Sequence, residues 1–330
     1  MEIKKINKLM LGIFVLHVTI VALATKFPEA FELNVILDLS LGELILFVPT
    51  LVYLVFWVLG AKNRRQAIGI AEGEETVVTN ETLWNRLYFN KVKPSTLGYV
   101  LLFTWLSMPL TTLLNAISML FVENTVVSLS EYMLEIPFPI MLCLMAVTPA
   151  FCEEVVFRGV VYGGYRRGGN KFWAVILSGF LFGVMHGNLN QALYAFAIGV
   201  LLALLFEATG SIFTTMLFHF IYNAQSCCMM YLADAMMPGY FSEAAVAAVG
   251  PEELYMMISV YLVLAAVFTP LAICVLYKIA KNETRVPQLK ETLPKRREGE
   301  IKIATISFWL ANIVAVGYII YDMIAARYIY

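Results

Sequence analysis

The chain has 330 residues, of which 60% are hydrophobic and 14% are charged, and its mean hydropathy is +0.77. An ordinary soluble domain carries about 25% charged residues, so the composition indicates an integral membrane protein. The net charge of −1, without a dense basic stripe, excludes nucleic acid as a partner. The five cysteines fall in apolar segments without metal-type spacing, so they predict neither a disulfide framework nor a cysteine metal site.

The chain contains nine apolar segments, each of a length that can cross about 30 Å of hydrocarbon. They predict an all-α fold, a polytopic transmembrane helix bundle of about eight or nine spans. We expect three regions: N-terminal helices with a cytoplasmic connection (1–130), a central core (137–232) and C-terminal helices (233–330). The segments are Leu9–Thr25, Gly42–Gly60, Thr96–Phe121, Pro137–Gly163, Phe172–Asn188, Leu189–Gly210, Ser211–Leu232, Tyr255–Ile279 and Ala304–Ile324.

The distribution of charge predicts the orientation. Lysine and arginine collect before the first segment and in the connections at 61–95, 164–171 and 280–300, whereas the connections at 122–136 and 233–254 contain acidic residues and no basic ones. Because basic connections remain on the cytoplasmic side, we expect a multi-pass protein of the plasma (inner) membrane with a cytoplasmic N-terminus. The first segment resembles a cleavable signal peptide, but we expect a retained anchor.

The fourth segment contains ionisable side chains, which cost several kcal/mol inside a bilayer and are therefore candidate functional residues. Glu154 and Arg158 are four residues apart and share a helix face, which predicts an ion pair, while Glu153 lies about 100° away. We expect Glu153, beside a like charge in a dry cavity, to act as a general base. A cluster that reaches water at the helix end is the alternative. Pro149 predicts a kink just before the pair.

The fifth and seventh segments add further polar groups. His186 ends the fifth segment, and Gly179 and Gly183 on its own face should let a neighbouring helix come close. His219 and Asn223, four residues apart in the seventh segment, could together hold a developing oxyanion. They could equally be a polar pair that joins two helices.

These groups are best satisfied if they share one cavity, because separate uncompensated burials in a bilayer would each be costly. We therefore expect Glu153, His186 and His219 to converge. His17, in the first segment, has no evident partner and is expected to be a packing or interface residue.

Three motifs occur in order, each in its own apolar segment: Glu-Glu-x-x-x-Arg at 153–158, Phe-x-x-x-His at 182–186 and His-x-x-x-Asn at 219–223. Over roughly residues 137–227 the chain thereby resembles the CAAX protease and bacteriocin-processing family of intramembrane proteases, which includes the type II CAAX prenyl endopeptidases. The resemblance implies cleavage of a membrane-associated protein or peptide. It implies that Glu153 and His186 activate a water, and that the oxyanion is stabilised by a histidine and an amide. The catalytic residues it implies are Glu153, Glu154, Arg158, His186, His219 and Asn223.

The resemblance leaves metal dependence open, because members of the family are often described as metalloproteases. Glu153, His186 and His219 could supply the two-histidine, one-carboxylate set of a catalytic zinc site. The sequence has no His-Glu-x-x-His, which excludes the site-2 type of zinc protease. Asn223 is a poor zinc ligand and a good hydrogen-bond donor, which favours a metal-independent, glutamate-activated water. The expected cofactor is therefore none, with Zn²⁺ as the alternative.

The composition does not choose between processing of prenylated CAAX proteins and peptide processing or bacteriocin immunity. The main alternative to an enzyme is a non-catalytic membrane binder or scaffold, such as a bacteriocin immunity protein. A small-solute transporter with a proton relay is a third class, although its inverted repeats are not evident. The expected partners are a membrane-associated protein or peptide substrate and the lipid bilayer. The sequence predicts neither the substrate's identity nor the oligomeric state.

Overall fold

The computed structural model describes residues 2–27, 29, 35–71, 82–124, 127, 129–242, 250–294 and 302–329. The regular elements in these ranges are helices, which confirms the predicted all-α class. Parts of the basic connections predicted at 61–95 and 280–300 lie outside the described residues. The elements are α1 Glu2–Lys26, α2 Val35–Ala71, α3 Leu83–Arg86, α4 Pro94–Ser118, α6 Ser130–Leu134, α7 Phe138–Leu142, the π-helical η2 Cys143–Val147, α8 Thr148–Glu154, the π-helical η3 Val155–Tyr162, α9 Gly163–Gly168, α10 Lys171–Met185, α11 Leu189–Thr209, α12 Ile212–Met236, α14 Pro251–Asn282, α15 Val286–Lys290 and α16 Ile306–Ile329.

All nine predicted apolar segments are helical, and the chain is a polytopic membrane protein. Within the described ranges, seven segments are long and apolar enough to cross a membrane. The other two are α10, which has 15 residues, and α12, which has 25 residues and carries several polar side chains. The seven are Glu2–Lys26, Leu39–Gly60, Pro94–Ser118, Phe138–Gly168, Leu189–Thr209, Pro251–Asn282 and Ile306–Ile324.

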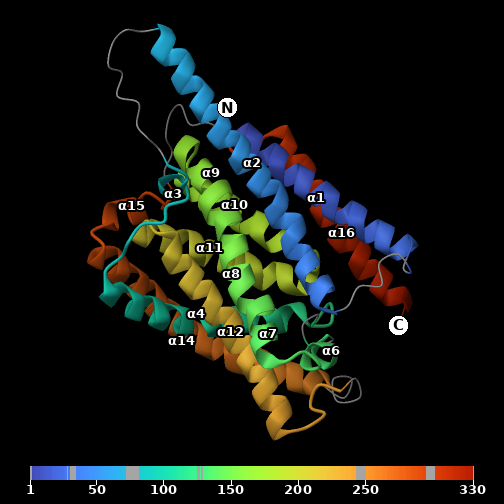
Figure 1. The fold of residues 1–330 in the computed structure, drawn as a ribbon. Helices are drawn as coiled ribbons and strands as arrows, with labels where there is room; N and C mark the ends of the chain where they lie inside the picture. The colour runs from blue at the N-terminus through green and yellow to red at the C-terminus, as the bar shows by residue number, and fades with distance from the viewer. Residues whose placement is uncertain are drawn as a thin grey trace.

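Helices far apart in the sequence lie side by side in the bundle (Figure 1). The N-terminal α1 packs along the C-terminal α16, and α4 packs along α14. Between these pairs, α8 contacts both α2 and α12. Helices from the N-terminal and the C-terminal parts of the chain therefore surround its central segment.

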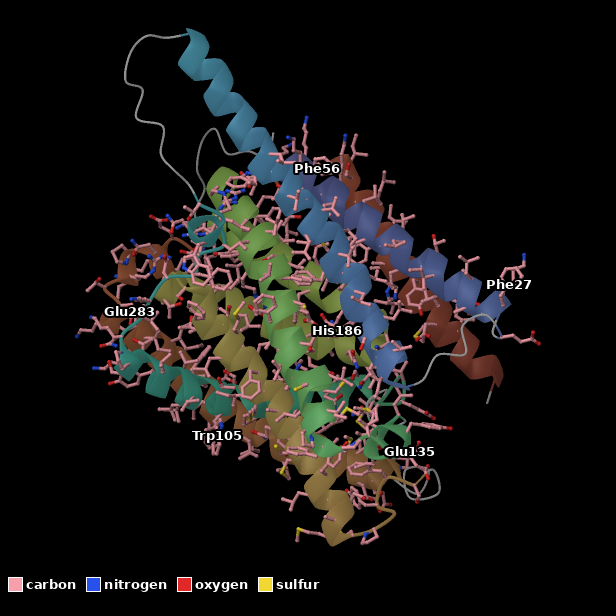
Figure 2. All side chains as sticks on the ribbon, in the orientation of Figure 1. Phe27, Phe56, Trp105, Glu135, His186 and Glu283 are labelled. Atoms are coloured by element: carbon pink, nitrogen blue, oxygen red, sulfur yellow. The ribbon has the colours of Figure 1, made fainter. Side chains whose placement is uncertain are left out.

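The periphery of the bundle carries large apolar side chains. Phe56 is 69% exposed and Trp105 is 66% exposed, and both lie at the edge of the bundle, whereas His186 lies near its centre (Figure 2). Extended exposed apolar surface of this kind marks contact with a membrane or a partner. Because these helices also have the length and composition of membrane spans, we infer that their exposed apolar side chains contact lipid.

The fourth span is wound irregularly on both sides of its glutamates. It runs without a break from α7 through η2, α8 and η3 to α9, so π-helical turns precede and follow Glu153 and Glu154. Pro149, which has no N–H to donate, follows η2 almost directly. The irregularity expected at this proline therefore takes the form of π-helical winding, which is common at functional sites.

The predicted close approach of a helix to the glycines of α10 is confirmed, and the helix is α11. A Cβ atom added to Gly183 would lie 2.6 Å from the carbonyl oxygen of Ala192, and one added to Gly199 would lie 2.8 Å from Cα of Gly179. These distances are shorter than van der Waals contact, so the two backbones touch. The contact holds α10, and with it His186, firmly against the rest of the core.

Candidate active site

The centre of the site is the carboxylate of Glu154, which is completely buried. Its Oε1 lies 3.1 Å from Nη1 of Arg158, so the ion pair predicted from the i, i+4 spacing is confirmed. The same oxygen accepts a hydrogen bond of 2.9 Å from Nδ1 of His219 on α12. Glu154 thus joins the fourth span to α12.

Arg158 carries its charge inside the bundle with a side chain that is only 2% exposed. Its guanidinium lies over the ring of Phe182, 4.5 Å from the centroid, and it donates to the backbone carbonyl of Gly199 over 3.5 Å. A buried cation is tolerated only with compensating partners. Here the carboxylate of Glu154, an aromatic face and a backbone oxygen supply them from three helices.

His219 lies between the two glutamates. With Nδ1 committed to Glu154, its Nε2 faces Glu153 and lies 3.9 Å from Oε2 of that residue. This distance is beyond hydrogen-bond range, so Glu153 adjoins His219 without being bonded to it. Glu153 is also less deeply buried, with a side chain that is 14% exposed. As expected, the two neighbouring carboxylates have different environments.

His186 forms the C-terminal cap of α10 rather than lying inside a helix. Its Nδ1 donates to the carbonyl oxygen of Phe182 over 2.9 Å, which leaves Nε2 as the basic nitrogen of the neutral ring. The Phe182 ring has its centroid 5.3 Å from that of His186 and 5.9 Å from that of His219. His186 therefore adjoins the cluster through Phe182, and within the described residues it makes no ion pair with Glu153 or Glu154.

Asn223 lies one turn beyond His219 on α12, and its amide nitrogen donates to the backbone carbonyl of Met145 over 2.9 Å. Met145 belongs to η2, so this hydrogen bond joins α12 to the fourth span. The second N–H of the amide remains for another acceptor. Both roles considered for the His219 and Asn223 pair, joining helices and donating to a ligand, are compatible with this arrangement.

One residue of this cluster was not expected from the sequence. Glu43, on α2, has its carboxyl group next to that of Glu153, close enough for the two groups to interact electrostatically. The signal was available, because Glu43 is an acidic residue inside the predicted span Gly42–Gly60, and such a residue is a functional candidate by default. What the sequence could not indicate is that α2 would pack against α8.

The donors proposed for a zinc ion do not form a ready site. Across the described ranges, no group of three or more His, Cys, Asp or Glu side chains is arranged to hold a metal ion. Nδ1 of each histidine is bonded within the protein, to Glu154 for His219 and to a backbone carbonyl for His186, which leaves Nε2 of each ring for a water or a ligand. Because the three side chains are not arranged as a ligand set, we derive no chemical step through a metal.

A second buried carboxylate, Glu207 on α11, belongs to a separate ionic cluster. Tyr162 donates its hydroxyl to Glu207 over 2.9 Å, and Arg166 and Lys171 form ion pairs with the same carboxylate. Arg285 also lies against it and donates to the Glu207 backbone carbonyl. These contacts connect α11 to η3, α9, α10 and the start of α15, so they hold the bundle together at that end.

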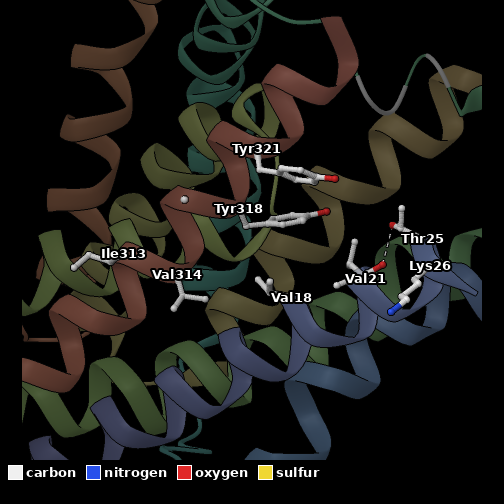
Figure 3. Close-up of a pocket in the computed structure, with 10 residues that line it drawn as sticks. Val18, Val21, Thr25, Lys26, Ile313, Val314, Tyr318 and Tyr321 are labelled. Atoms are coloured by element: carbon white, nitrogen blue, oxygen red, sulfur yellow. Dashed lines mark hydrogen bonds between the residues drawn. The ribbon is translucent and has the colours of Figure 1, made fainter. Parts of the chain in front are cut away.

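A cavity lies away from these carboxylates, between α1 and α16 (Figure 3). It has a volume of about 530 Å³, and its walls are mostly apolar, with the rings of Tyr318 and Tyr321 on the α16 side and Val21, Thr25 and Lys26 on the α1 side. The candidate catalytic residues do not line it. Nearby, His17 packs its ring edge-on against Tyr318 with centroids 5.6 Å apart, as expected for a packing histidine.

The fold is that of a multi-pass membrane protein, and its helices enclose a polar centre built from Glu153, Glu154, Arg158 and His219. More particularly, residues 135–225 match the family model of the type II CAAX prenyl endopeptidase Rce1-like proteins, and the chain carries an Rce1-like domain over this range. The resemblance recognised in the three motifs is thus confirmed.

A curated relative gives weaker support. The chain is 28% identical over 85 residues to the "Putative membrane peptidase YdiL" of Bacillus subtilis (strain 168). The similarity covers 26% of this chain and only 35% of the length of that relative. No solved structure matches the chain.

Proposed function

We propose that the chain is an intramembrane endopeptidase of the CAAX protease type, with its catalytic core in residues 137–232. The observation that carries this proposal is the contact network of Glu153, Glu154, Arg158 and His219 inside a membrane-spanning bundle. Ionisable groups at such a position are costly and are retained for function. The Rce1-like match extends over the same residues and supports the same conclusion.

In the proposed reaction Glu153 accepts a proton from a water molecule whose oxygen attacks the carbonyl carbon of the peptide bond. Nε2 of His186 accepts a hydrogen bond from the same water and orients it. The carbonyl π electrons move to oxygen. In this proposal His219 is an imidazolium, which donates Nδ1–H to Glu154 and Nε2–H to the oxyanion, and the amide of Asn223 donates a second hydrogen bond to the oxyanion. When the tetrahedral intermediate collapses, the C–N bond breaks and Glu153 returns the proton to the leaving nitrogen.

Glu154 and Arg158 act by holding this machinery in place. Glu154 fixes the orientation of the His219 ring through Nδ1, so that Nε2 is directed toward Glu153. Arg158 neutralises Glu154 and anchors it to the ring of Phe182. Both are positioning residues in this proposal, because their partners are other side chains rather than the substrate.

The proposed substrate is a membrane-associated protein or peptide, since the peptide bond has to reach a site enclosed by membrane-spanning helices. Cleavage of prenylated CAAX proteins and processing of a small peptide are both within this class. We further propose a plasma (inner) membrane location with the N-terminus in the cytoplasm, because lysine and arginine collect on the corresponding connections.

The test is a proteomic comparison of membranes from cells that contain the wild-type protein or the Glu153→Ala variant. We expect a defined set of peptide termini that is present with the wild type and lost with the variant. Glu135→Ala, which removes an exposed carboxylate far from the site along the chain, is the control and should leave these termini unchanged. Identical termini for wild type and Glu153→Ala would contradict the proposal.

The same comparison separates an enzyme from a non-catalytic scaffold. A scaffold would hold its partner equally well with Glu153→Gln, because the amide keeps the shape of the carboxylate. Co-purification of one partner with both forms, without any change in termini, would replace the protease with a binding protein.

A further inference from the structure

Glu43 is a carboxyl group that the proposed mechanism does not yet use. It belongs to the membrane-spanning part of α2, four residues before Phe47. Residues at this spacing share a helix face, and the ring of Phe47 packs edge-on against that of Phe151 on α8, with centroids 5.9 Å apart. The face of α2 that carries Glu43 therefore lies against the helix that carries Glu153.

The carboxyl groups of Glu43 and Glu153 are neighbours in the interior of the bundle. Two ionised carboxylates have only acceptor oxygens and repel each other. Oε2 of Glu43 and Oε2 of Glu153 are both buried, and neither receives a hydrogen bond from another described residue. The two buried groups can satisfy each other only if one of them is a neutral carboxylic acid that donates its O–H to the other.

The surroundings indicate which of the two carries this proton. Glu153 interacts with the charge of Arg158 and lies 3.9 Å from Nε2 of His219, and both groups favour an ionised carboxylate. Glu43 forms no ion pair within the described part of the chain, and its interaction partner at the site is Glu153. A carboxyl group buried without a cation is more stable in its neutral form, so the donor is Glu43.

We propose that Glu43 is a positioning residue of the active site, a neutral carboxylic acid that donates its O–H to Glu153. The donated hydrogen bond fixes the rotamer of Glu153 and directs its free oxygen toward the water that it activates. The site then draws on α2 as well as on α8, α10 and α12. The catalytic consequence rests on the proposed function, whereas the hydrogen bond and the protonated state of Glu43 do not.

Glutamine is the decisive replacement, because its side-chain amide has nearly the same shape and can donate an N–H where Glu43 donates its O–H. We expect Glu43→Gln to retain the wild-type kcat within a few-fold. Glu43→Ala has no donor, and we expect it to lower kcat by up to about 100-fold with little change in KM, since a reacting group displaced by about 1 Å has an effect of this size. A purely structural role for Glu43 would not give this split between the two variants.

A second measurement does not depend on cleavage. The infrared spectrum of the purified protein at neutral pH should contain the C=O stretching band of a protonated carboxyl group, and Glu43→Gln should remove it. Glu135→Gln makes the same chemical change at an exposed position and should leave the band in place. Persistence of the full band in Glu43→Gln would overturn the inference.

The two measurements together separate the inference from the function on which it rests. If the wild-type protein cleaves nothing, the proposed function fails, and the infrared band still decides whether Glu43 is the protonated partner. If the wild type is active and Glu43→Ala keeps full kcat, the positioning role is wrong while the proposed function stands.

Discussion

Nδ1 of His219 donates a hydrogen bond of 2.9 Å to Oε1 of Glu154, across two helices whose residues are 65 positions apart in the chain. This contact turns the other ring nitrogen toward Glu153. It also explains why two adjacent glutamates are needed, since one holds the histidine and the other is left to act as the base.

Glu154→Gln should lower kcat by about 100-fold or more, the range expected when an acid–base group is wrongly placed. The neutral amide of glutamine no longer stabilises a positive charge on His219, so the ring would be a neutral imidazole and a weaker donor to the oxyanion. The measurement is kcat and KM on a substrate found in the proteomic comparison, with Glu135→Gln as the control. An unchanged kcat would show that the orientation of His219 by Glu154 has no part in the reaction.

Arg158→Met should destabilise the protein by about 3–5 kcal/mol, because it leaves the carboxylate of Glu154 buried without its cation. The measurement is the free energy of unfolding in mixed detergent micelles. The double variant Arg158→Met/Glu154→Gln should recover part of this loss, since it contains no unpaired buried charge. If the double variant is less stable than Arg158→Met, the electrostatic explanation is wrong.

Gly183→Ala should destabilise the bundle by about 1–3 kcal/mol, the usual cost of overpacking. The added Cβ atom would lie 2.6 Å from the backbone oxygen of Ala192, which cannot move without shifting α11. Gly98→Ala on α4 is the matched control, because a Cβ atom there meets no atom within 4 Å and alanine favours the helix. Thermal unfolding that shifts equally in both variants would argue against a tight contact between α10 and α11.

Cleavage should continue after treatment with a metal chelator, because the proposed mechanism activates the water with Glu153 and His186 and uses no metal. The measurement is the cleavage rate before and after dialysis against the chelator, together with the metal content of the purified protein. Loss of activity that is restored by added zinc would establish a metalloenzyme and would require a different role for Glu153.

Part of the site could be read from spacing along single helices. The pairing of Glu154 with Arg158 follows from an i, i+4 interval, and the close approach at Gly183 follows from the absence of a side chain on the face of His186. The apolar segments predicted the helical class in the same way, because a bilayer leaves few alternatives for the backbone. Nine apolar segments were predicted, but only seven helices in the described ranges are long and apolar enough to cross a membrane. The difference comes from α10, which is too short, and from α12, which is too polar.

The sequence by itself determined the membrane class, the helical segments and the ionisable residues that a bilayer would not retain without a use. Only the tertiary structure decided which of these residues meet: Glu43 with Glu153, and His219 with Glu154. The physical reason is that helical periodicity orders side chains along one helix, whereas contacts between helices depend on how their surfaces pack. No interval in the sequence encodes that α2 and α12 both lie against α8.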